Sequence, residues 1–365
     1  PVPGDERAVE VGWIAGSCDY RDRLTIDPER RSIELATAPV PGCDAIGFPV
    51  AMRLTLERPI EVGQLRTDIE QGGLVELGDL VPETVTFADP SLGWVGGTTA
   101  AGDAIVAETS DGGATWTIAG LGWGSVTDIA LLDGQAWAIV ECRERPCWRG
   151  LARRDGDGLW GYPFPEAFTR IAADPPSLVA IESPGAGATS AARRLVRTDP
   201  STWAVESLAD PCADSLALAD VAASASELLA LCRFEDVSSG QPLGLYASAD
   251  GGRTWALRTS GEPGAQLPPA GGPVGLSLAA DGGGWLWGPP IPLQRTTDGG
   301  ASFAAVQLTL GGANVANLAL AASALPGGSG FVLVRDELAQ ATVLVRIDDG
   351  GAGWSAIAAW EAGGE

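Results

Sequence analysis

The sequence lacks residues on which many enzyme active sites depend. Its 365 residues include no histidine and only three tyrosines. All 23 basic residues are arginine, because no lysine occurs. Without histidine the chain cannot form a Ser-His-Asp triad or a histidine metal site, and it lacks the commonest general base. The composition therefore excludes several large classes of hydrolase and metalloenzyme.

Positive charge is also scarce. The 23 arginines are outnumbered by 47 acidic residues, which gives a formal net charge of -24. A field of this sign repels phosphate backbones and anionic lipids, so we expect neither nucleic acid nor a membrane surface as partner. No run of about 18 apolar residues occurs, so we expect no membrane span. An acidic, solvated surface without a specific partner is the simplest interpretation of the charge.

Six cysteines are present, and proximity in the sequence suggests the pairs Cys18 with Cys43, Cys142 with Cys147, and Cys212 with Cys232. Zinc is the competing interpretation, and it is weak because histidine and a CxxC pair are both absent. Disulfides indicate an oxidising compartment. A chain that starts at Pro1 without Met indicates a mature form. We therefore expect an extracytoplasmic protein, secreted or attached to the cell envelope, and a monomer.

A short repeated motif is the strongest signal in the sequence. Three copies have the form Ser/Thr-x-Asp-Gly-Gly-x-Thr/Ser-Trp/Phe, and three degenerate copies extend the series. The aspartate and aromatic residue of the six copies are Asp111 and Trp116, Asp155 and Trp160, Asp199 and Trp203, Asp250 and Trp255, Asp298 and Phe303, and Asp349 and Trp354. Successive aspartates are 44, 44, 51, 48 and 51 residues apart. That period suits a four-stranded propeller blade.

Short apolar runs between Gly, Pro and Ser clusters precede the motifs and predict strands. They cover residues 93–96, 136–140, 228–231, 284–287 and 331–334. Residues 33–35 and 50–56 alternate like half-buried strands, although no complete motif lies near them. No long stretch has the helical period, so the predicted class is all-β.

The motif resembles the Asp-box, or BNR, repeat of sialidase-like β-propellers, and the chain is similar to the photosystem II assembly factor group of propellers. The resemblance covers roughly residues 82–360. It implies that each motif is a hairpin turn between the third and fourth strands of a blade. The aspartate then accepts hydrogen bonds from the turn, the glycine pair takes positive φ, and the aromatic residue packs between blades. The motif residues are therefore expected to be structural.

From the six motifs we expect six four-stranded blades, with a seventh around residues 67–73 as the alternative. We place a small N-terminal β subdomain in residues 1–80 and the propeller in residues 81–365. Blade topology puts the motif turns on one face of the disc. The loops between second and third strands, and between blades, lie on the opposite face, where propellers usually bind ligands.

A candidate binding patch lies on that second face. Arg143, Arg233 and Arg335 are each expected at the end of a second strand, close to the channel, and Arg145, Trp148 and Arg149 follow the first of them. Arginine suits bidentate carboxylate capture and stacking, so the patch would recognise an acidic or aromatic group. The alternative is a set of Arg–Glu pairs that steady loop ends. The expected disulfides also fall on this face and would rigidify its loops.

A catalytic site is not evident. Sialidase chemistry needs three arginines on the substrate carboxylate and a Tyr nucleophile with a Glu partner. Tyrosine occurs only at positions 20, 162 and 246, and Tyr246 precedes a motif serine as a packing residue. The acidic loops at Asp155 and Asp157, and at Asp348 and Asp349, lack the ligand spacing of an EF-hand, so solvated turns are preferred over calcium sites. We expect no metal and no cofactor.

Three functions stay open at this point. The first is a non-catalytic binding or assembly scaffold of the cell envelope, with a protein or glycan partner. The second is a carbohydrate-active hydrolase of sialidase-like fold, in which two unrecognised carboxylates do the work. The third is a structural surface module. The absence of histidine and of a sialidase signature favours the first.

Overall fold

The computed structural model describes two compact units of the chain. The first unit contains strands β1 to β4, and the second contains every element from β5 onward. The described residues are 8–16, 23–27, 32–36, 47–55, 80–100, 102–141, 150–154, 160–164, 168–182, 191–197, 203–213, 217–234, 242–260, 267, 273–289, 291–310, 313–337, 339–351 and 353–361. The division of the chain into residues 1–80 and 81–365 stays a prediction.

The first unit consists of two antiparallel strand pairs. β1 (Ala8–Gly16) pairs with β4 (Gly47–Thr55), and β2 (Arg23–Asp27) pairs with β3 (Ser32–Ala36). Residues 33–35 fall in β3, and residues 50–55 fall in β4, as the alternating pattern predicts.

The second unit contains six sheets of four antiparallel strands, each formed by consecutive strands of the chain. We call them blades 1 to 6. Blade 1 is β5 (Leu80–Phe87), β6 (Gly93–Thr99), β7 (Asp103–Thr109) and β8 (Thr117–Trp123). Blade 2 is β9 (Ser125–Leu132), β10 (Gln135–Glu141), β11 (Gly150–Arg154) and β12 (Trp160–Phe164). Blade 3 is β13 (Phe168–Asp174), β14 (Ser177–Glu182), β15 (Ala191–Arg197) and β16 (Trp203–Ser207).

The other three blades follow the same plan. Blade 4 is β17 (Ala217–Ala223), β18 (Leu228–Arg233), β19 (Leu243–Ser248) and β20 (Ala256–Ser260). Blade 5 is β21 (Gly275–Leu278), β22 (Gly284–Gly288), β23 (Ile291–Thr296) and β24 (Ala304–Ala305). Blade 6 is β27 (Ala319–Leu325), β28 (Ser329–Asp336), β29 (Ala341–Asp348) and β30 (Gly353–Glu361).

Helical structure in the described residues is limited to 3-10 turns. They are η3 (Ala316–Leu318), η4 (Pro326–Gly328) and η5 (Asp349–Gly351). A short hairpin of β25 (Thr309–Leu310) and β26 (Ala313–Asn314) connects blades 5 and 6. No helix in the described part of the chain is long and apolar enough to cross a bilayer.

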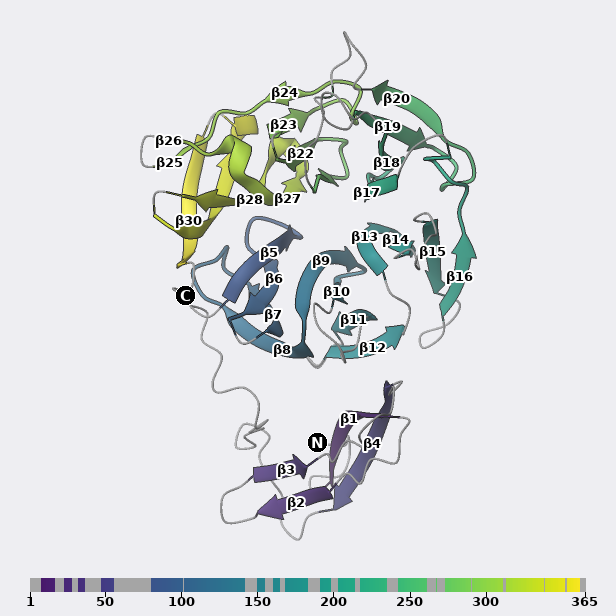
Figure 1. The fold of residues 1–365 in the computed structure, drawn as a ribbon, viewed down its shortest axis with the longest axis vertical. Helices are drawn as coiled ribbons and strands as arrows, with labels where there is room; N and C mark the ends of the chain where they lie inside the picture. The colour runs from purple at the N-terminus through teal and green to yellow at the C-terminus, as the bar shows by residue number, and fades with distance from the viewer. Residues whose placement is uncertain are drawn as a thin grey trace. The chain divides into compact units, whose positions relative to one another are not determined.

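The six blades form a closed ring around a central axis (Figure 1). The first strand of each blade lies innermost and contacts the first strand of the next, and β27 contacts β5 to complete the circle. This is the six-bladed β-propeller that the motif period predicts. Six blades close the ring, so a seventh is not part of it. Residues 67–73, the alternative seventh unit, lie outside the described residues.

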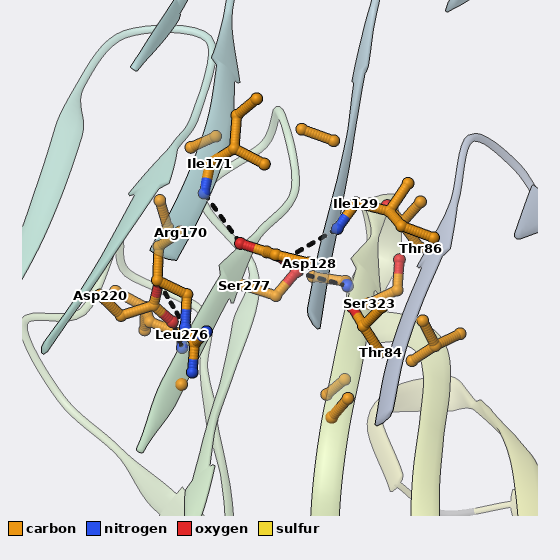
Figure 2. A pocket seen from close by; sticks show the side chains of 18 of the residues that line it. Thr84, Thr86, Asp128, Ile129, Arg170, Ile171, Asp220, Leu276, Ser277 and Ser323 are labelled. Atoms are coloured by element: carbon orange, nitrogen blue, oxygen red, sulfur yellow. Dashed lines mark hydrogen bonds and ion pairs between the residues drawn. The ribbon is translucent and has the colours of Figure 1, made fainter. Parts of the chain in front are cut away.

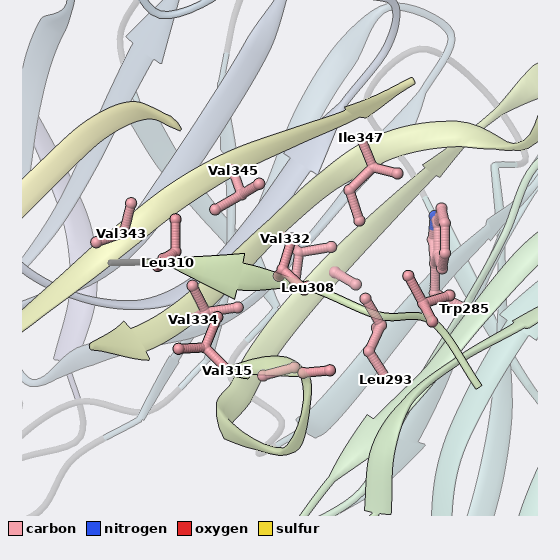
Figure 3. Packing of buried hydrophobic residues seen from close by; sticks show 14 residues of the cluster. Trp285, Leu293, Leu308, Leu310, Val315, Val332, Val334, Val343, Val345 and Ile347 are labelled. Atoms are coloured by element: carbon pink, nitrogen blue, oxygen red, sulfur yellow. The ribbon is translucent and has the colours of Figure 1, made fainter. Parts of the chain in front are cut away.

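The hydrophobic core is divided into clusters that lie between neighbouring blades. One cluster joins Trp285 and Leu293 of blade 5 to Val332 and Ile347 of blade 6, all buried, with Leu308 of the connecting segment between them (Figure 3). Similar clusters join blades 1 and 2, 2 and 3, 3 and 4, and 4 and 5. Each sheet buries both of its faces against neighbouring blades, so its second strand is a nearly continuous run of apolar residues. That is why residues 136–140 and 228–231 stood out in the sequence.

Blades 6 and 1 are joined by side-chain contacts. The rings of Phe87 and Phe331 stack with centroids 3.5 Å apart, and the Phe87 N–H donates to the Ser323 hydroxyl at 2.8 Å. Trp116 meets the buried Trp360 edge to face at 6.3 Å. The junction is therefore sealed by aromatic packing, and every blade keeps its four strands from one stretch of chain.

The three complete motif turns share one hydrogen-bond pattern. In blade 1 the buried Thr109 hydroxyl donates to Asp111 Oδ1 at 2.8 Å and accepts from the Gly113 N–H at 2.8 Å. Asp111 also accepts from the Thr115 N–H and hydroxyl, at 2.8 and 2.6 Å. Ser248 with Asp250, and Thr296 with Asp298, repeat these contacts in blades 4 and 5. Both glycines of each turn have positive φ, from 67 to 95°. The turns connect third and fourth strands, as predicted.

Most of the motif aromatics described by the structure pack between blades, but one does not. Trp203 meets Trp137 of blade 2 edge to face at 4.9 Å, and Trp255 and Phe303 pack against the clusters of blades 3 and 4 and of blades 4 and 5. The prediction is wrong for Trp354, which is 39% exposed. Ile347 and Gly353 replace the hydroxyl residues of that motif, and the side chain of Asp349 lies outside the described residues. Asp155, Asp199 and the side chain of Trp160 lie outside the described residues.

Candidate functional site

The central channel holds a cavity of about 250 Å³. It is lined by the first strands of all six blades, and Figure 2 shows polar side chains on its wall. Polar groups in a concave site formed by several elements are the usual starting point of a ligand site. The channel is therefore the candidate functional site.

In five of the six blades, a β-bulge places one residue of the inner strand at the same level of the channel. The register of the first two strands shifts at Glu83, Thr127, Thr169, Ala219 and Leu320. The residues that follow these bulges are Thr84, Asp128, Arg170, Asp220 and Ala321. Bulges redirect the side chain that follows them. Three consecutive blades, 2 to 4, thus carry Asp128, Arg170 and Asp220 at one level.

Both carboxylates are bound to the wall. Asp128 accepts from its neighbour Ile129 N–H at 3.0 Å and from Ile171 N–H of blade 3 at 2.8 Å. Asp220 accepts from Val221 N–H at 2.8 Å and from Leu276 N–H of blade 5 at 2.7 Å. Each aspartate therefore links the inner strand of its blade to the inner strand of the next (Figure 2).

Serines make the same kind of link elsewhere in the ring. Ser277 of blade 5 accepts from Ala324 N–H of blade 6 at 3.0 Å, and Ser323 of blade 6 accepts from Phe87 N–H of blade 1. Ser277 and Ser323 lie two residues further along their inner strands than the positions that are level with the aspartates. A hydroxyl satisfies the neighbouring amide without a charge, so the linking role alone does not explain why blades 2 and 4 carry carboxylates. The choice of aspartate is thus a feature of the site.

Arg170 lies between the two aspartates. Its Nε is 3.9 Å from Asp220 Oδ1, and one of its terminal nitrogens donates to the Thr169 carbonyl at 2.7 Å. Burial raises the pKa of Asp128 to about 6 and the pKa of Asp220 to about 7, although the Arg170 charge and the backbone N–H groups act in the opposite direction. The wall therefore holds more carboxylate than its one arginine neutralises.

Blade 5 contributes an aromatic wall instead of a charge. Gly275 faces Trp287 across β21 and β22, and a Cβ at Gly275 would overlap the indole ring. The indole therefore occupies the space that a side chain of the inner strand fills in the other blades. Its N–H donates to the Leu320 carbonyl of blade 6 at 2.9 Å. Trp287 thus lines the channel from the same blade whose Leu276 N–H bonds to Asp220.

The predicted arginine patch is described only in part. Arg233 and Arg335 lie two residues beyond the level of Asp220 and Ala321, so they occupy equivalent ends of β18 and β28. Arg335 is exposed and Arg233 is half-buried, where burial and the charge of Arg170 lower its pKa. In blade 2 the register assigns the equivalent position to Glu141, and Arg143 lies outside the described residues, so the threefold arginine alignment stays a prediction. Arg143, Arg145, Trp148 and Arg149 lie outside the described residues.

One of the three predicted disulfides is confirmed. Cys212, before the first strand of blade 4, bonds to Cys232 in its second strand, with the Cα atoms 5.5 Å apart. Both cysteines are buried. Cys18, Cys43, Cys142 and Cys147 lie outside the described residues. No group of three or more potential metal ligands occurs among the described residues.

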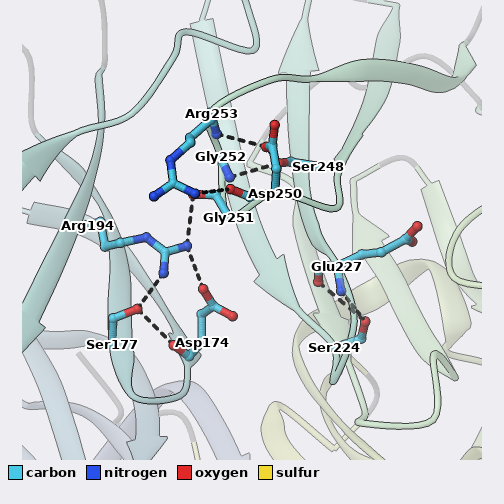
Figure 4. Close-up of polar contacts among 10 residues, drawn as sticks. All are labelled: Asp174, Ser177, Arg194, Ser224, Glu227, Ser248, Asp250, Gly251, Gly252 and Arg253. Carbon is cyan, nitrogen blue, oxygen red and sulfur yellow. Dashed lines mark hydrogen bonds and ion pairs between the residues drawn. The ribbon is translucent and has the colours of Figure 1, made fainter.

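The structure reveals arginines that the sequence did not indicate. Arg194 donates to the Gly251 carbonyl of the next blade's motif turn at 2.9 Å, and also contacts Asp174 at 2.6 Å and the Ser177 hydroxyl at 2.8 Å (Figure 4). Arg258 and Arg295 donate in the same way to Gly299 and Gly350, both at 2.9 Å. Lysine lacks the planar fork that serves three acceptors at once. These arginines therefore connect blades 3, 4 and 5 to the motif turn of the following blade.

Comparisons with known proteins find only distant structural similarity. No family model matches the chain, and no curated protein matches it. Among solved structures, YCF48 bound to a D1 peptide is 17% identical, with a TM-score of 0.43 over 76% of this chain and 82% of that one. The SapL1 lectin in complex with alpha methyl fucoside is 12% identical, with a TM-score of 0.48 over 79% and 99%.

An α-L-arabinanase of Penicillium chrysogenum, complexed with arabinobiose, is 14% identical with a TM-score of 0.39 over 63% of this chain and 79% of that one. Identities and TM-scores this low carry no inference about function, because one fold hosts unrelated functions. Function must therefore be argued from the residues of this chain.

Proposed function

We propose that this chain is a non-catalytic binding scaffold, an extracytoplasmic propeller of the Asp-box type that presents its channel and the surrounding loops to a protein or glycan partner. The observation that carries the proposal is the channel wall, where Asp128, Arg170, Asp220 and Trp287 come from four consecutive blades to line one cavity. A few polar groups beside an aromatic surface are typical of binding sites.

The hydrogen bonds of the two aspartates favour binding over catalysis. A carboxyl group that acts as general acid must hold a proton that it can transfer to its substrate. Here both oxygens of Asp128 and of Asp220 accept backbone N–H groups, one of them from the next blade. Each oxygen keeps a second lone pair, which suits recognition of a hydrogen-bond donor.

The disulfide supports an extracytoplasmic location. Cys212 and Cys232 are bonded in the described structure, and bonds of this kind persist in oxidising compartments. The arginine patch of Arg143, Arg145, Trp148, Arg149, Arg233 and Arg335 remains part of the proposal as a rim around the channel that would contact acidic or aromatic groups of the partner.

A carbohydrate-active hydrolase is the second candidate, and one observation favours it. Asp128 and Asp220 are two carboxyls with raised pKa values in one cavity, and such groups occur often at catalytic sites. Glycoside hydrolysis uses two carboxyl groups, one of them protonated.

Binding and turnover can be measured on the same preparation. The full chain is applied to glycan and peptide arrays, and also incubated with chromogenic glycosides. We expect saturable binding to one class of array ligand and no release of product. Turnover that is lost in Asp220→Asn but kept in Ser277→Ala, which removes a similar inter-blade bond without a charge, would establish the hydrolase and overturn the scaffold.

A further inference from the structure

The channel wall carries an excess of negative charge. The ionisable residues that line the cavity are Glu83, Asp128, Arg170 and Asp220, which makes three carboxyls and one guanidinium. Glu141 and Arg233 act on this group from the ends of neighbouring second strands and leave the excess unchanged. An anion that entered the channel would meet this wall and the field of a chain with net charge -24. A cation would be attracted by both.

An aromatic ring lines the same cavity as the carboxylates. Asp220 bonds to the Leu276 N–H, and Trp287 lies over Gly275, the residue before Leu276. The two side chains line the same cavity from opposite faces of β21, Asp220 on the side of blade 4 and Trp287 on the side of blade 6. The face of an indole attracts cations through its quadrupole, and tryptophan is the best of the aromatic residues in this respect. A cavity lined by both carboxylates and an indole is complementary to a guanidinium or ammonium group.

We propose that the channel binds a cationic side chain, arginine or lysine, of a partner polypeptide, with Asp220 and Asp128 as counter-charges and Trp287 as the aromatic wall. This inference rests on the proposed scaffold function and names the chemistry of its partner. Arg170 stays between the aspartates and fixes their positions. Neutral sugars and acidic groups gain less from the same wall, because neither relieves its charge.

Proton linkage gives the proposal a specific signature. Burial raises the pKa of both aspartates, so near neutral pH the wall retains protons that an exposed carboxyl would have lost. A bound cation favours the ionised form and displaces a proton. Binding is therefore expected to release protons and to become tighter as pH rises through the range of these carboxyls.

The test is calorimetric titration of the full chain with N-acetyl-arginine amide. We expect at least tenfold tighter binding at pH 7.5 than at pH 5, and a heat that depends on the ionisation enthalpy of the buffer, which reports proton release. N-acetyl-glutamate amide and methyl glycosides serve as acidic and neutral probes and are expected to bind at least tenfold more weakly.

Variants locate the site. Asp220→Asn is expected to weaken arginine binding about tenfold and to reduce proton release, and Trp287→Leu to weaken it about fivefold. Two matched controls should stay within twofold of the original chain. Ser277→Ala removes an inter-blade bond in the same channel, and Trp354→Leu removes an exposed indole elsewhere. Trp287→Leu leaves every carboxylate bond in place, so it tests the site even if Asp220→Asn fails to fold.

The outcomes separate this inference from the proposed function. Preference for the acidic or neutral probe, or arginine binding that ignores both Asp220→Asn and Trp287→Leu, would overturn the cationic channel and leave the scaffold standing. If no array peptide or glycan binds the chain at all, the scaffold fails as well.

Discussion

The stability of the propeller is expected to fall as pH rises from 4 to 7, which is opposite to the usual behaviour of buried ion pairs. The cause is the pair of channel aspartates. Their pKa values rise from 3.8 to about 6 for Asp128 and about 7 for Asp220, mainly through burial. In the unfolded chain both carboxyls ionise near pH 4, while in the fold they keep their protons. Between pH 4 and pH 7 the unfolded chain loses these protons while the folded chain retains them, so rising pH favours the unfolded state. The stability that the two protonated carboxyls contribute below pH 4 is therefore lost by about pH 7.

The size of the effect follows from these values. One unit of pKa corresponds to about 1.4 kcal/mol, so Asp220 alone accounts for about 4 kcal/mol and Asp128 for about 3. Both interact with Arg170, so their contributions do not add. We expect a loss of about 4 kcal/mol between pH 4 and pH 7. In a domain of this size such a loss lowers the melting temperature by roughly 10 °C.

The motif turns act in the opposite direction below pH 4. Hydrogen bonds from the Thr115 hydroxyl and N–H lower the pKa of Asp111 to about 2, and the equivalent bonds from Thr254 lower the pKa of Asp250. A depressed pKa contributes stability above pH 4 that is lost as pH falls through the folded value. The free energy of unfolding is therefore expected to peak between about pH 4 and 5.

Urea unfolding followed by tryptophan fluorescence at pH 3, 4.5, 6 and 7.5 measures this profile, because the chain has 13 tryptophans. The net charge of -24 also destabilises the fold as pH rises, so the series is repeated in 0.5 M NaCl. Salt screens exposed charges and leaves buried ones largely unaffected. The Asp128→Asn/Asp220→Asn double variant should flatten the decline between pH 4.5 and 7.5 at high salt. A decline of equal slope in the double variant, or a rise toward pH 7, would refute the reasoning.

Three further predictions concern the links within and between blades. Ser248→Ala leaves the Gly252 N–H of a buried turn without its acceptor, and is expected to lower the free energy of urea unfolding by about 2 kcal/mol, whereas Ser226→Ala on an exposed bend should change it by less than about 0.5. In Arg194→Lys the side chain cannot reach Asp174, Ser177 and Gly251 together, so we expect the free energy of unfolding to fall by about 1–2 kcal/mol. The loss should be smaller when Asp174 is already Ala, and additive losses in this double-mutant cycle would contradict the contact. Gly113→Ala introduces a Cβ that overlaps Ile357 at the junction of blades 1 and 6 and should lower the melting temperature. Gly134→Ala is the control and should lower it less, because Gly134 also has positive φ but no neighbour within 4 Å. Equal shifts would mean that Ile357 moves aside without cost.

The architecture was predictable because the propeller repeats its local chemistry. A turn that needs Asp, two glycines with positive φ and flanking hydroxyls leaves a readable pattern, and Asp111, Asp250 and Asp298 all occupy the turns expected of them. The second strands were equally clear, since strands buried on both faces are continuous apolar runs. Trp354 shows the limit of the pattern, because its motif has lost both hydroxyl residues and its side chain is exposed.

The channel cluster was not found in the sequence because its members lie about one blade apart and each stands alone among apolar residues. A signal does exist. Three tripeptides share one pattern of a charged residue, a β-branched residue and alanine: Asp128-Ile129-Ala130, Arg170-Ile171-Ala172 and Asp220-Val221-Ala222. Aligning the first strands at the motif period would have superimposed them. What no alignment supplies is the β-bulge before each charge, which places the three side chains at one level.

Trp287 was recognised only as part of an apolar strand. Its place in the channel depends on Gly275 in the neighbouring strand, which leaves room for the ring. The arginines that reach Gly251, Gly299 and Gly350 were missed for a similar reason, since their acceptors are backbone carbonyls of the next blade. Side chains whose partners are main-chain atoms of a distant segment leave no pattern of residue types.

The seal between Phe87 and Phe331 has a consequence for how the ring is assembled. The chain itself crosses five of the six junctions between blades, so the partners at those junctions are close in sequence. At the sixth junction the Phe87 amide and the Ser323 hydroxyl are 236 residues apart. Bringing such distant segments together carries the largest loop-closure entropy in the unit. Blades 6 and 1 contact each other through side chains such as the stacked Phe87 and Phe331, and no sheet contains strands from both blades. The ring can therefore open at this junction without the loss of any strand pairing.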